Sequence, residues 1–186
     1  MRISELFIMA VVLSMDAFAV SVCKGLALKN VRAVQALWVG LWFGVFQALM
    51  PLIGYLLGVS FKGIVESFAP WIAFVLLAII GINMIKETFS PEEAQDNLLG
   101  IKQMLPLAVA TSIDALAVGV SFAMLDDVNI VYAVSFIGVI TFVLSALGVK
   151  MGSIFGTKYN KRAQITGGIV LILLGIKILL EHFGII

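Results

Sequence analysis

The feature that most constrains this chain is a set of long apolar segments that are almost free of charge. The stretch from Val34 to Phe61 contains no charged residue at all. A helix needs about 20 apolar residues to cross the roughly 30 Å hydrocarbon core of a bilayer. Over the whole chain 62% of residues are hydrophobic and only 12% are charged. Because soluble domains carry about 25% charged residues, the sequence excludes a soluble fold and predicts an integral membrane protein.

Six segments approach the length of a membrane span: Leu6–Cys23, Val34–Phe61, Ser67–Ile85, Gln103–Leu125, Val128–Val149 and Ala163 to about Phe183. Their apolar runs are continuous and do not alternate with period two, which favours helices over the strands of a barrel. The sixth segment is the weakest, because Lys177 lies inside it. We therefore predict an all-α protein with six transmembrane helices, in which Pro91 ends the third helix within a polar loop.

The two halves of the chain resemble each other. The segment Ser14–Val20 (SMDAFAV) aligns with Ser112–Val118 (SIDALAV) at an offset of 98 residues, which also aligns Gly40, Gly54 and Gly58 with Gly138, Gly152 and Gly156. An offset of 94 aligns Gly81 with Gly175 in the third and sixth helices. Three spans per half is an odd number, so the second half enters the membrane from the opposite side. We predict two inverted-topology repeats, residues 1–89 and 103–186, joined by a cytoplasmic loop at 90–102.

The distribution of basic residues predicts the orientation. The segment ends on the N-terminal side of the membrane carry two basic residues, Arg2 and Lys62. The opposite side carries nine: Lys24, Lys29, Arg32, Lys86, Lys102, Lys150, Lys158, Lys161 and Arg162. Since cytoplasmic loops are enriched in Lys and Arg, we expect both chain ends to lie outside the cytoplasm.

Two aspartates at matching positions of the repeat are the main candidates for function. Asp16 and Asp114 lie near the centre of the first and fourth segments. An Asp at the centre of a transmembrane helix costs roughly 2.5–3.5 kcal/mol, and such residues usually mark ion or substrate paths. A structural role is the alternative, either as a protonated hydrogen-bonding group or in an ion pair with Lys177. The symmetry of the pair favours one shared site at mid-depth.

Side chains with oxygen atoms accompany these aspartates and would complete a metal site: Ser14, Gln47, Asn83, Thr111 and Ser112. Oxygen ligands suit a hard divalent cation such as Mn²⁺ or Mg²⁺ better than Zn²⁺ or Cu⁺. The thioethers of Met15 and Met50 could add a softer ligand, although packing is their simpler role. Small residues in the first helix, including Ala10, Ser14 and Ser21, form a stripe typical of close helix packing.

Several other classes of function are excluded. The single Cys23 and the single His182 provide neither a metal-site spacing nor a nucleophile–base pair. The chain has no phosphate-binding loop motif, and its net charge of +1 gives no reason to expect nucleic acid as a partner. We therefore expect a membrane transporter that is not an enzyme and that holds no cofactor.

The sequence resembles the MntP-type manganese efflux pump family over essentially its whole length. The resemblance is carried by Ser14–Ala19 (SMDAFA), Phe43–Gly54 (FGVFQALMPLIG), Trp71–Phe74 (WIAF) and Ala110–Gly119 (ATSIDALAVG). It implies a six-helix protein of the bacterial inner membrane that exports Mn²⁺ from the cytoplasm. The family's intramembrane aspartates correspond to Asp16 and Asp114, whereas some members carry an acid where this chain has Gln47.

Three hypotheses follow. The first is a secondary-active exporter of a divalent cation, with Mn²⁺ bound by the two aspartates and protons returning in exchange. The second is an exporter of amino acids or other small solutes, similar in size and helix count to the LysE-type carriers. The third is a membrane subunit that transports nothing, in which the aspartates only hold helices together. The anionic character of the midplane residues favours a cationic cargo. Neither the oligomeric state nor the selectivity among Mn²⁺, Fe²⁺, Mg²⁺ and Cd²⁺ follows from the sequence.

Overall fold

The computed structural model describes residues 3–28, 30–58, 62–87, 99–123, 125 and 128–184. The secondary structure in these residues consists of five helices: α1 Ile3–Ala27, α2 Ala33–Leu57, α3 Lys62–Glu87, α4 Ile101–Phe122 and α5 Ile130–His182. The prediction of an all-helical protein is confirmed. Pro91 and most of the predicted 90–102 loop lie outside the described residues.

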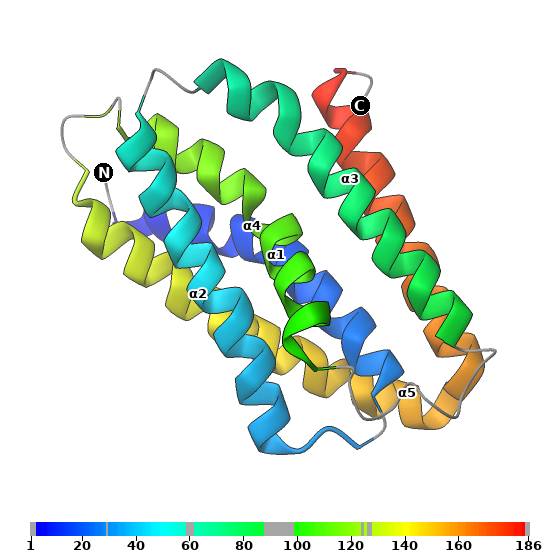
Figure 1. Cartoon of the computed structure of the whole chain (residues 1–186). Helices are drawn as coiled ribbons and strands as arrows, with labels where there is room; N and C mark the ends of the chain where they lie inside the picture. The colour runs from blue at the N-terminus through cyan, green and yellow to red at the C-terminus, as the bar shows by residue number, and fades with distance from the viewer. Residues whose placement is uncertain are drawn as a thin grey trace.

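The fifth and sixth predicted helices are the two arms of α5, whose 53 helical residues reverse direction between them (Figure 1), so the prediction of six helical segments is confirmed. A straight helix of 53 residues would reach about 80 Å, far more than the thickness of a bilayer. Figure 1 shows that α5 turns back on itself instead, so that its first arm (Ile130–Phe155) and its second arm (165–182) run in opposite directions.

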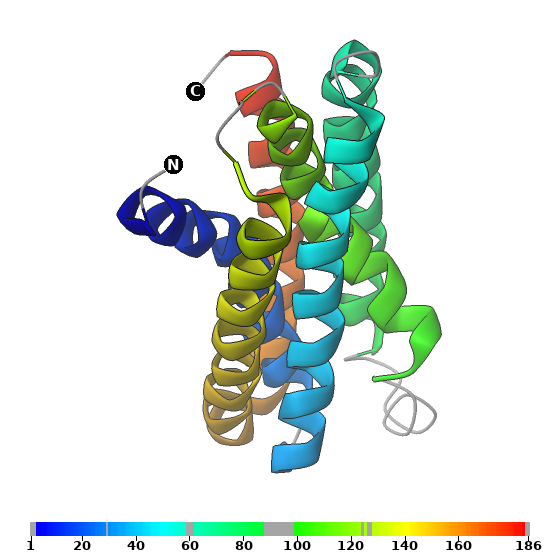
Figure 2. The same cartoon turned by 90° about the vertical axis from the view of Figure 1, so that its left-hand side faces the viewer.

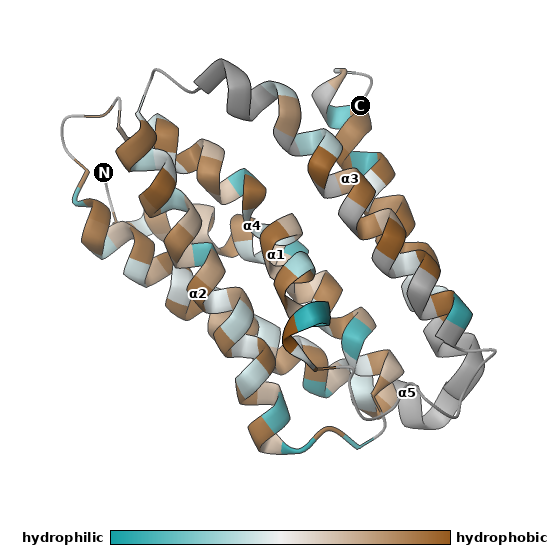
Figure 3. Cartoon of the chain, in the orientation of Figure 1, coloured by the Kyte–Doolittle hydropathy of each residue, from teal (hydrophilic) through white to brown (hydrophobic). Residues whose placement is uncertain are grey.

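Four segments are long and apolar enough to cross a membrane, judged over the described residues: Ile3–Ala27, Ala33–Leu57, Ile101–Phe122 and Ile130–Phe155. Within α3 only the shorter apolar stretch Pro70–Ile79 is found, and the second arm of α5 does not qualify. Large apolar side chains such as Val12, Val131 and Val139 are each more than 60% exposed. Figure 3 shows apolar residues along all the helices. A bundle with such an outer surface is stable only in lipid, so the chain is a multi-pass membrane protein.

Consecutive helices alternate in direction. In Figure 1 α1 runs downward, α2 upward, α3 downward and α4 upward, and the two arms of α5 continue the alternation. The beginning of α1 and the end of α5 therefore lie toward the same end of the bundle, as Figure 2 also shows from the side. The opposite end carries Lys24 at the end of α1 and Arg32 before the start of α2. We refer to this second end as the basic end.

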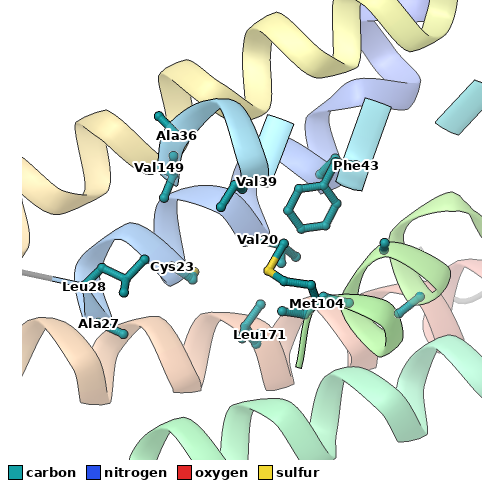
Figure 4. Packing of buried hydrophobic residues seen from close by; sticks show 14 of the residues in the cluster. Val20, Cys23, Ala27, Leu28, Ala36, Val39, Phe43, Met104, Val149 and Leu171 are labelled. Atoms are coloured by element: carbon teal, nitrogen blue, oxygen red, sulfur yellow. The ribbon is translucent and has the colours of Figure 1, made fainter. Parts of the chain in front are cut away.

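The core between the helices is formed by small and medium-sized apolar side chains. Val20, Phe43, Met104 and Leu171 come from α1, α2, α4 and α5, and each is at most 2% exposed. Figure 4 shows these four side chains pointing toward one another at the centre of the cluster. Because they come from four different helices, their contact fixes the positions of these helices relative to one another.

The α1 helix and the first arm of α5 pack in parallel along a constant register. Ser14 contacts Thr141, Ser21 lies against Gly148, and the Cα atom of Gly25 lies close to Gly152. These three pairs share the offset of 127 residues that separates Ser14 from Thr141. A Cβ atom on Gly152 would overlap the Val22 carbonyl oxygen. The two backbones can therefore approach so closely only because this position has no side chain.

Candidate functional site

The two predicted aspartates lie on helices from different halves of the chain. Asp16 is near the middle of α1 and Asp114 near the middle of α4. The two carboxylates are close enough for their charges to interact. Asp16 is half-buried and Asp114 is exposed, although Ser112 and Ala115 next to Asp114 are buried. An ion that enters between the helices can therefore reach both groups.

Each aspartate retains free oxygen atoms. The backbone N–H of Ala115 donates to Asp114 Oδ1 at 2.8 Å, which leaves Oδ2 available. Among the residues that the structure describes, no hydrogen bond or ion pair is made by the side chain of Asp16. Thr111 lies three residues before Asp114, on nearly the same face of α4. The hydroxyl of Thr111 is buried and donates to the Leu107 carbonyl oxygen at 3.0 Å, so its lone pairs remain available to a ligand.

Gln47 lies next to this region and has a defined orientation. Its side chain is completely buried, and Nε2 donates to the Leu13 carbonyl oxygen at 3.1 Å. Leu13 is three residues before Asp16, so the amide reaches α1 within one turn of that carboxylate. The other atom of the amide, Oε1, is buried without a hydrogen-bond partner among the described residues. A buried carbonyl oxygen without a partner is costly, which makes Oε1 a candidate ligand atom.

Ser14 and Ser112 point away from the aspartates. Each lies two residues before its aspartate, and two residues correspond to about 200° around a helix. Ser14 Oγ is 2.7 Å from Thr141 Oγ1 on α5, and it also donates to the Ala10 carbonyl oxygen at 2.6 Å. Ser112 Oγ donates to the Ala108 carbonyl oxygen at 2.7 Å. The hydroxyl of Ser14 thus faces α5, on a different side of α1 from Asp16.

A charged pair on the second arm of α5 also lies near Asp16. Lys177 Nζ is 3.2 Å from Glu181 Oε1, and both side chains are about half exposed. The charges of Lys177 and Glu181 both interact with that of Asp16. The ammonium group therefore lies within electrostatic reach of the carboxylate while its direct partner is Glu181.

The remaining predicted candidates contribute less to this region. The side chain of Asn83 lies outside the described residues. Met15 is about half exposed on the outer surface of α1, as expected for a side chain that packs against lipid. Within the described part of the chain, no group of three or more His, Cys, Asp or Glu side chains could hold a metal. A metal site here must therefore combine the two carboxylates with neutral oxygen atoms.

Two buried hydroxyl residues of α5, Thr141 and Ser145, were not predicted from the sequence. Thr141 bonds to Ser14, and Ser145 lies one turn further along the same face of the helix. Ser145 also corresponds to Gln47 at the offset of 98 residues. The repeat therefore contained a signal for this position, because a polar residue in one half directs attention to its counterpart in the other.

Long apolar helices with a lipid-type outer surface define a multi-pass membrane protein. The family model described as "Mntp: Putative manganese efflux pump" matches residues 30–179. The chain belongs to this family of putative manganese efflux pumps, so it is a transporter rather than an enzyme.

Three relatives named "Putative manganese efflux pump MntP" are similar over nearly the full length. The protein of Desulfitobacterium hafniense (strain Y51) is 56% identical over 180 residues, covering 97% of this chain and 95% of the relative. The protein of Acetivibrio thermocellus is 54% identical over 184 residues, covering 98% and 92%. The protein of Mannheimia succiniciproducens is 52% identical over 185 residues, covering 98% of each chain. No solved structure is significantly similar to the chain.

Proposed function

We propose that this protein exports Mn²⁺ from the cytoplasm by binding the ion between Asp16 and Asp114, and that protons return in exchange. The observation that carries the proposal is that the carboxylates of Asp16 on α1 and Asp114 on α4 are close enough for their charges to interact. Each carboxylate alone would be costly inside a membrane. Together they supply two negative charges, which match one divalent cation in a region of low dielectric constant.

Neutral oxygen atoms complete the proposed site. Gln47 Oε1 is buried and has no partner in the described part of the chain, and the Thr111 hydroxyl lies on the face of α4 that carries Asp114. Both are hard oxygen ligands of the type that Mn²⁺ accepts. In this proposal Ser14 and Ser112 do not bind the ion directly, and they help to hold α1 and α4 in position. Asn83 would correspond to Lys177 in the second half, and we retain it as a further ligand candidate.

An inverted repeat explains a set of helix contacts that otherwise have no relation to one another. A Cβ atom at Gly40 would lie 2.7 Å from the Phe142 carbonyl oxygen, and one at Gly138 would lie 3.0 Å from that of Gly44. The offset of 98 residues relates the two contacts, because Gly40 corresponds to Gly138 and Gly44 corresponds to Phe142.

The third helices behave in the same way. A Cβ atom at Gly81 would lie 2.6 Å from the Gly168 carbonyl oxygen, and one at Gly175 would lie 3.3 Å from that of Phe74. The offset of 94 residues relates these two contacts, because Gly81 corresponds to Gly175 and Phe74 corresponds to Gly168. A contact that is repeated with the two halves exchanged supports a two-fold relation between residues 1–89 and 103–186. In this proposal Asp16 and Asp114 occupy equivalent positions on either side of the axis.

The charge distribution supports an orientation for transport. At the basic end, Lys24 Nζ donates to Gln103 Oε1 at 2.8 Å and Lys150 Nζ donates to the Val31 carbonyl oxygen at 3.1 Å. Following the positive-inside rule, we place this end in the cytoplasm of a bacterial inner membrane and both chain ends outside.

The transport cycle in this proposal has two halves. Mn²⁺ enters from the basic end, loses water to the two carboxylates and the neutral oxygens, and neutralises the site. The repeats then rock about the fixed site, as in other inverted-repeat transporters, and the ion leaves on the far side. The vacated carboxylates take up protons there, which removes their charge for the return step.

The experiment compares Asp16→Asn and Asp114→Asn with Glu5→Gln, a control on an acid near the beginning of α1. Mn²⁺ efflux is measured from cells loaded with the ion, and the amount of folded protein in the membrane is measured in parallel. Loss of one charged ligand should weaken binding by at least about tenfold, so both Asp variants should retain Mn²⁺ while Glu5→Gln exports it. The proposal is wrong if either Asp variant is produced normally and exports at the parental rate.

A further inference from the structure

The helices that carry the two aspartates form an antiparallel pair. In Figure 1 α1 and the first arm of α5 run in one direction, whereas α2 and α4 run in the other. Lys24 at the end of α1 bonds to Gln103 at the beginning of α4. Leu6 near the beginning of α1 packs in the same core cluster as Phe122 at the end of α4. The α1 and α4 helices are therefore joined at both ends.

The α2 helix and the first arm of α5 form a second antiparallel pair, and its register is the same when the two halves of the chain are exchanged. The contact of Gly40 with the Phe142 carbonyl oxygen corresponds to the contact of Gly138 with that of Gly44, and both are present. Exchange of the halves therefore leaves these two helices in the same position relative to each other.

The parallel contacts between the two pairs, in contrast, differ in register. A Cβ atom at Gly54 of α2 would overlap the Leu116 carbonyl oxygen of α4. At the offset of 98 residues an exact repeat would place Gly152 of α5 against Phe18 of α1. A Cβ atom at Gly152 would instead overlap the Val22 carbonyl oxygen, four residues further along α1. The α1 helix is therefore one turn out of the register that α4 adopts.

The glycines on the partner helices show the same difference. A Cβ atom at Gly119 of α4 would overlap the Pro51 carbonyl oxygen of α2. The corresponding residues are Ser21 and Val149, but the residue that lies against the Val149 carbonyl oxygen is Gly25, again four residues later. Two separate contacts thus give the same shift of four residues, which is about 6 Å along a helix with a rise of 1.5 Å per residue.

We propose that α1 and α4 move together by one helical turn relative to α2 and the first arm of α5, and that the present register and its exchanged counterpart are the two end states of transport. The inference rests on the inverted repeat and the Mn²⁺ export of the proposed function. In the exchanged state Phe18 takes the place of Val22, and Val120 takes that of Leu116. Each replacement moves its helix toward the basic end. The two aspartates stay together and shift by about 6 Å relative to α2.

The surface of α5 accommodates this shift. Phe18 now lies against Gly148, its carbonyl oxygen and a ring carbon each 3.0 Å from where a Cβ atom of that glycine would be. One turn further along α5 the residue is Gly152, so Phe18 meets a glycine in both registers. Ser21 arrives opposite Val149 in place of Gly25, and its small side chain keeps the two helices close.

Ser145 provides a partner for Ser14 in the exchanged register. Ser14 now bonds to Thr141. Ser145 lies one turn further along α5, completely buried, and its hydroxyl has no hydrogen-bond partner among the residues that the structure describes. A shift of four residues brings Ser14 from Thr141 to Ser145. Because the bond lost at one hydroxyl is replaced at the other, the two registers remain close enough in free energy to interconvert.

The hydrogen bond from Gln47 to α1 is also replaced. Gln47 Nε2 donates to the Leu13 carbonyl oxygen, and this bond between the two pairs breaks in the shift. At the offset of 98 residues Gln47 corresponds to Ser145 and Leu13 corresponds to Thr111. Exchange of the halves therefore places Ser145 next to the Thr111 carbonyl oxygen, which gives the buried hydroxyl an acceptor on α4.

The first test traps the exchanged register with disulfides in the full-length chain in native membranes. Cys23→Ala removes the single cysteine of the chain. In this background Ser14→Cys/Ser145→Cys is compared with the control Ser14→Cys/Ile137→Cys, after oxidation with iodine. Ser145 and Ile137 lie four residues on either side of Thr141, the present partner of Ser14. Each is about 6 Å along the helix from the facing position, too far for a disulfide to form without movement.

Oxidation collects even a state of low population, because the disulfide does not reopen under these conditions. We expect the Ser145 pair to cross-link at least about tenfold faster than the Ile137 pair. A third pair, Ser14→Cys/Thr141→Cys, should cross-link in the present register. Equal rates for the Ser145 and Ile137 pairs would overturn the proposal, and so would failure of the Thr141 pair to cross-link.

The second test asks whether transport requires the shift. The Ser14→Cys/Thr141→Cys protein is cross-linked in lipid vesicles, and its Mn²⁺ transport is compared with that of the same protein after reduction. Because one variant supplies both rates, any effect of the substitutions themselves is common to both. The cross-linked form should transport at less than about a tenth of the rate of the reduced form. Equal rates would overturn the proposal.

The outcomes separate this inference from the proposed function. If the parent transports Mn²⁺ and the Ser145 pair cross-links no faster than the Ile137 pair, only this inference is wrong. If the parent transports no Mn²⁺, the proposed function is wrong, and with it the role of the shift in transport.

Discussion

The hydrogen bond between Ser14 and Thr141 offers a quantitative test of how α1 and α5 are held together. Three short contacts surround these hydroxyls: Ser14 Oγ to the Ala10 oxygen at 2.6 Å, Thr141 Oγ1 to the Ile137 oxygen at 2.9 Å, and the two hydroxyls to each other at 2.7 Å. Only two hydroxyl hydrogens are present. At any moment, therefore, two of the three contacts can be hydrogen bonds.

Because two hydrogens serve three contacts, we predict a small coupling energy between Ser14 and Thr141. In Thr141→Val the Ser14 hydroxyl still donates to the Ala10 carbonyl oxygen, and in Ser14→Ala the Thr141 hydroxyl still donates to Ile137. Neither single change leaves a buried donor without an acceptor, so the large penalty for an unpaired group is avoided. We expect a double-mutant coupling of about 0.6 kcal/mol, the average for interhelical hydrogen bonds in membranes, and below the maximum of about 1.7 kcal/mol.

The coupling is measured by reversible unfolding in mixed micelles, followed by circular dichroism as the fraction of denaturing detergent rises. The four proteins are the parent, Ser14→Ala, Thr141→Val and the double variant. Ser14→Ala combined with Ser153→Ala serves as the control pair and should be additive within about 0.5 kcal/mol. A coupling of about 2 kcal/mol or more would refute the reasoning, because it would mean that each single change strands a hydroxyl. A coupling of zero would refute the pairing itself.

Two further predictions concern the packing and charge around the site. Gly152→Ala should prevent normal folding, because its Cβ atom would overlap the α1 backbone. Gly175→Ala, whose Cβ atom would lie 3.3 Å from its nearest neighbour, should lower the free energy of unfolding by only about 1–3 kcal/mol. Folded yield and melting temperature measure both effects, and equal values for the two variants would contradict the close packing of α1 against α5. Lys177→Met should change stability by less than about 0.5 kcal/mol, since the Lys177–Glu181 pair is exposed. The Lys177→Met variant should also bind Mn²⁺ more tightly, by less than about tenfold, because it lacks a positive charge that competes with the ion for Asp16. Titration with Mn²⁺ followed by electron paramagnetic resonance measures this affinity, and weaker binding than in the parent would contradict the prediction.

The helical fold follows from the sequence because burial in lipid leaves the backbone few alternatives. The reversal between the last two helical segments follows in the same way, because one straight helix of 53 residues would extend far beyond the bilayer.

The sequence indicated the two aspartates of the candidate site, but it did not show which neutral side chains lie near them. The repeat alone directs attention to Asp16 and Asp114, since they occupy matching positions in its two halves. Ser14 was grouped with Asp16 because the two are close in sequence, yet two residues along a helix point in nearly opposite directions. Which neighbouring helix each face meets is a tertiary property. For that reason Thr141 and the partners of Gln47 became visible only in the structure.

The most direct measurement of the central claim is a crystal structure of the protein grown with Mn²⁺, with data collected near the manganese absorption edge. The account predicts one anomalous peak per chain, lying between the carboxylates of Asp16 and Asp114 and within coordination distance of Gln47 Oε1. The same experiment on Asp114→Asn should show no peak at this position. A peak at the membrane surface only, or one that persists in Asp114→Asn, would contradict the account.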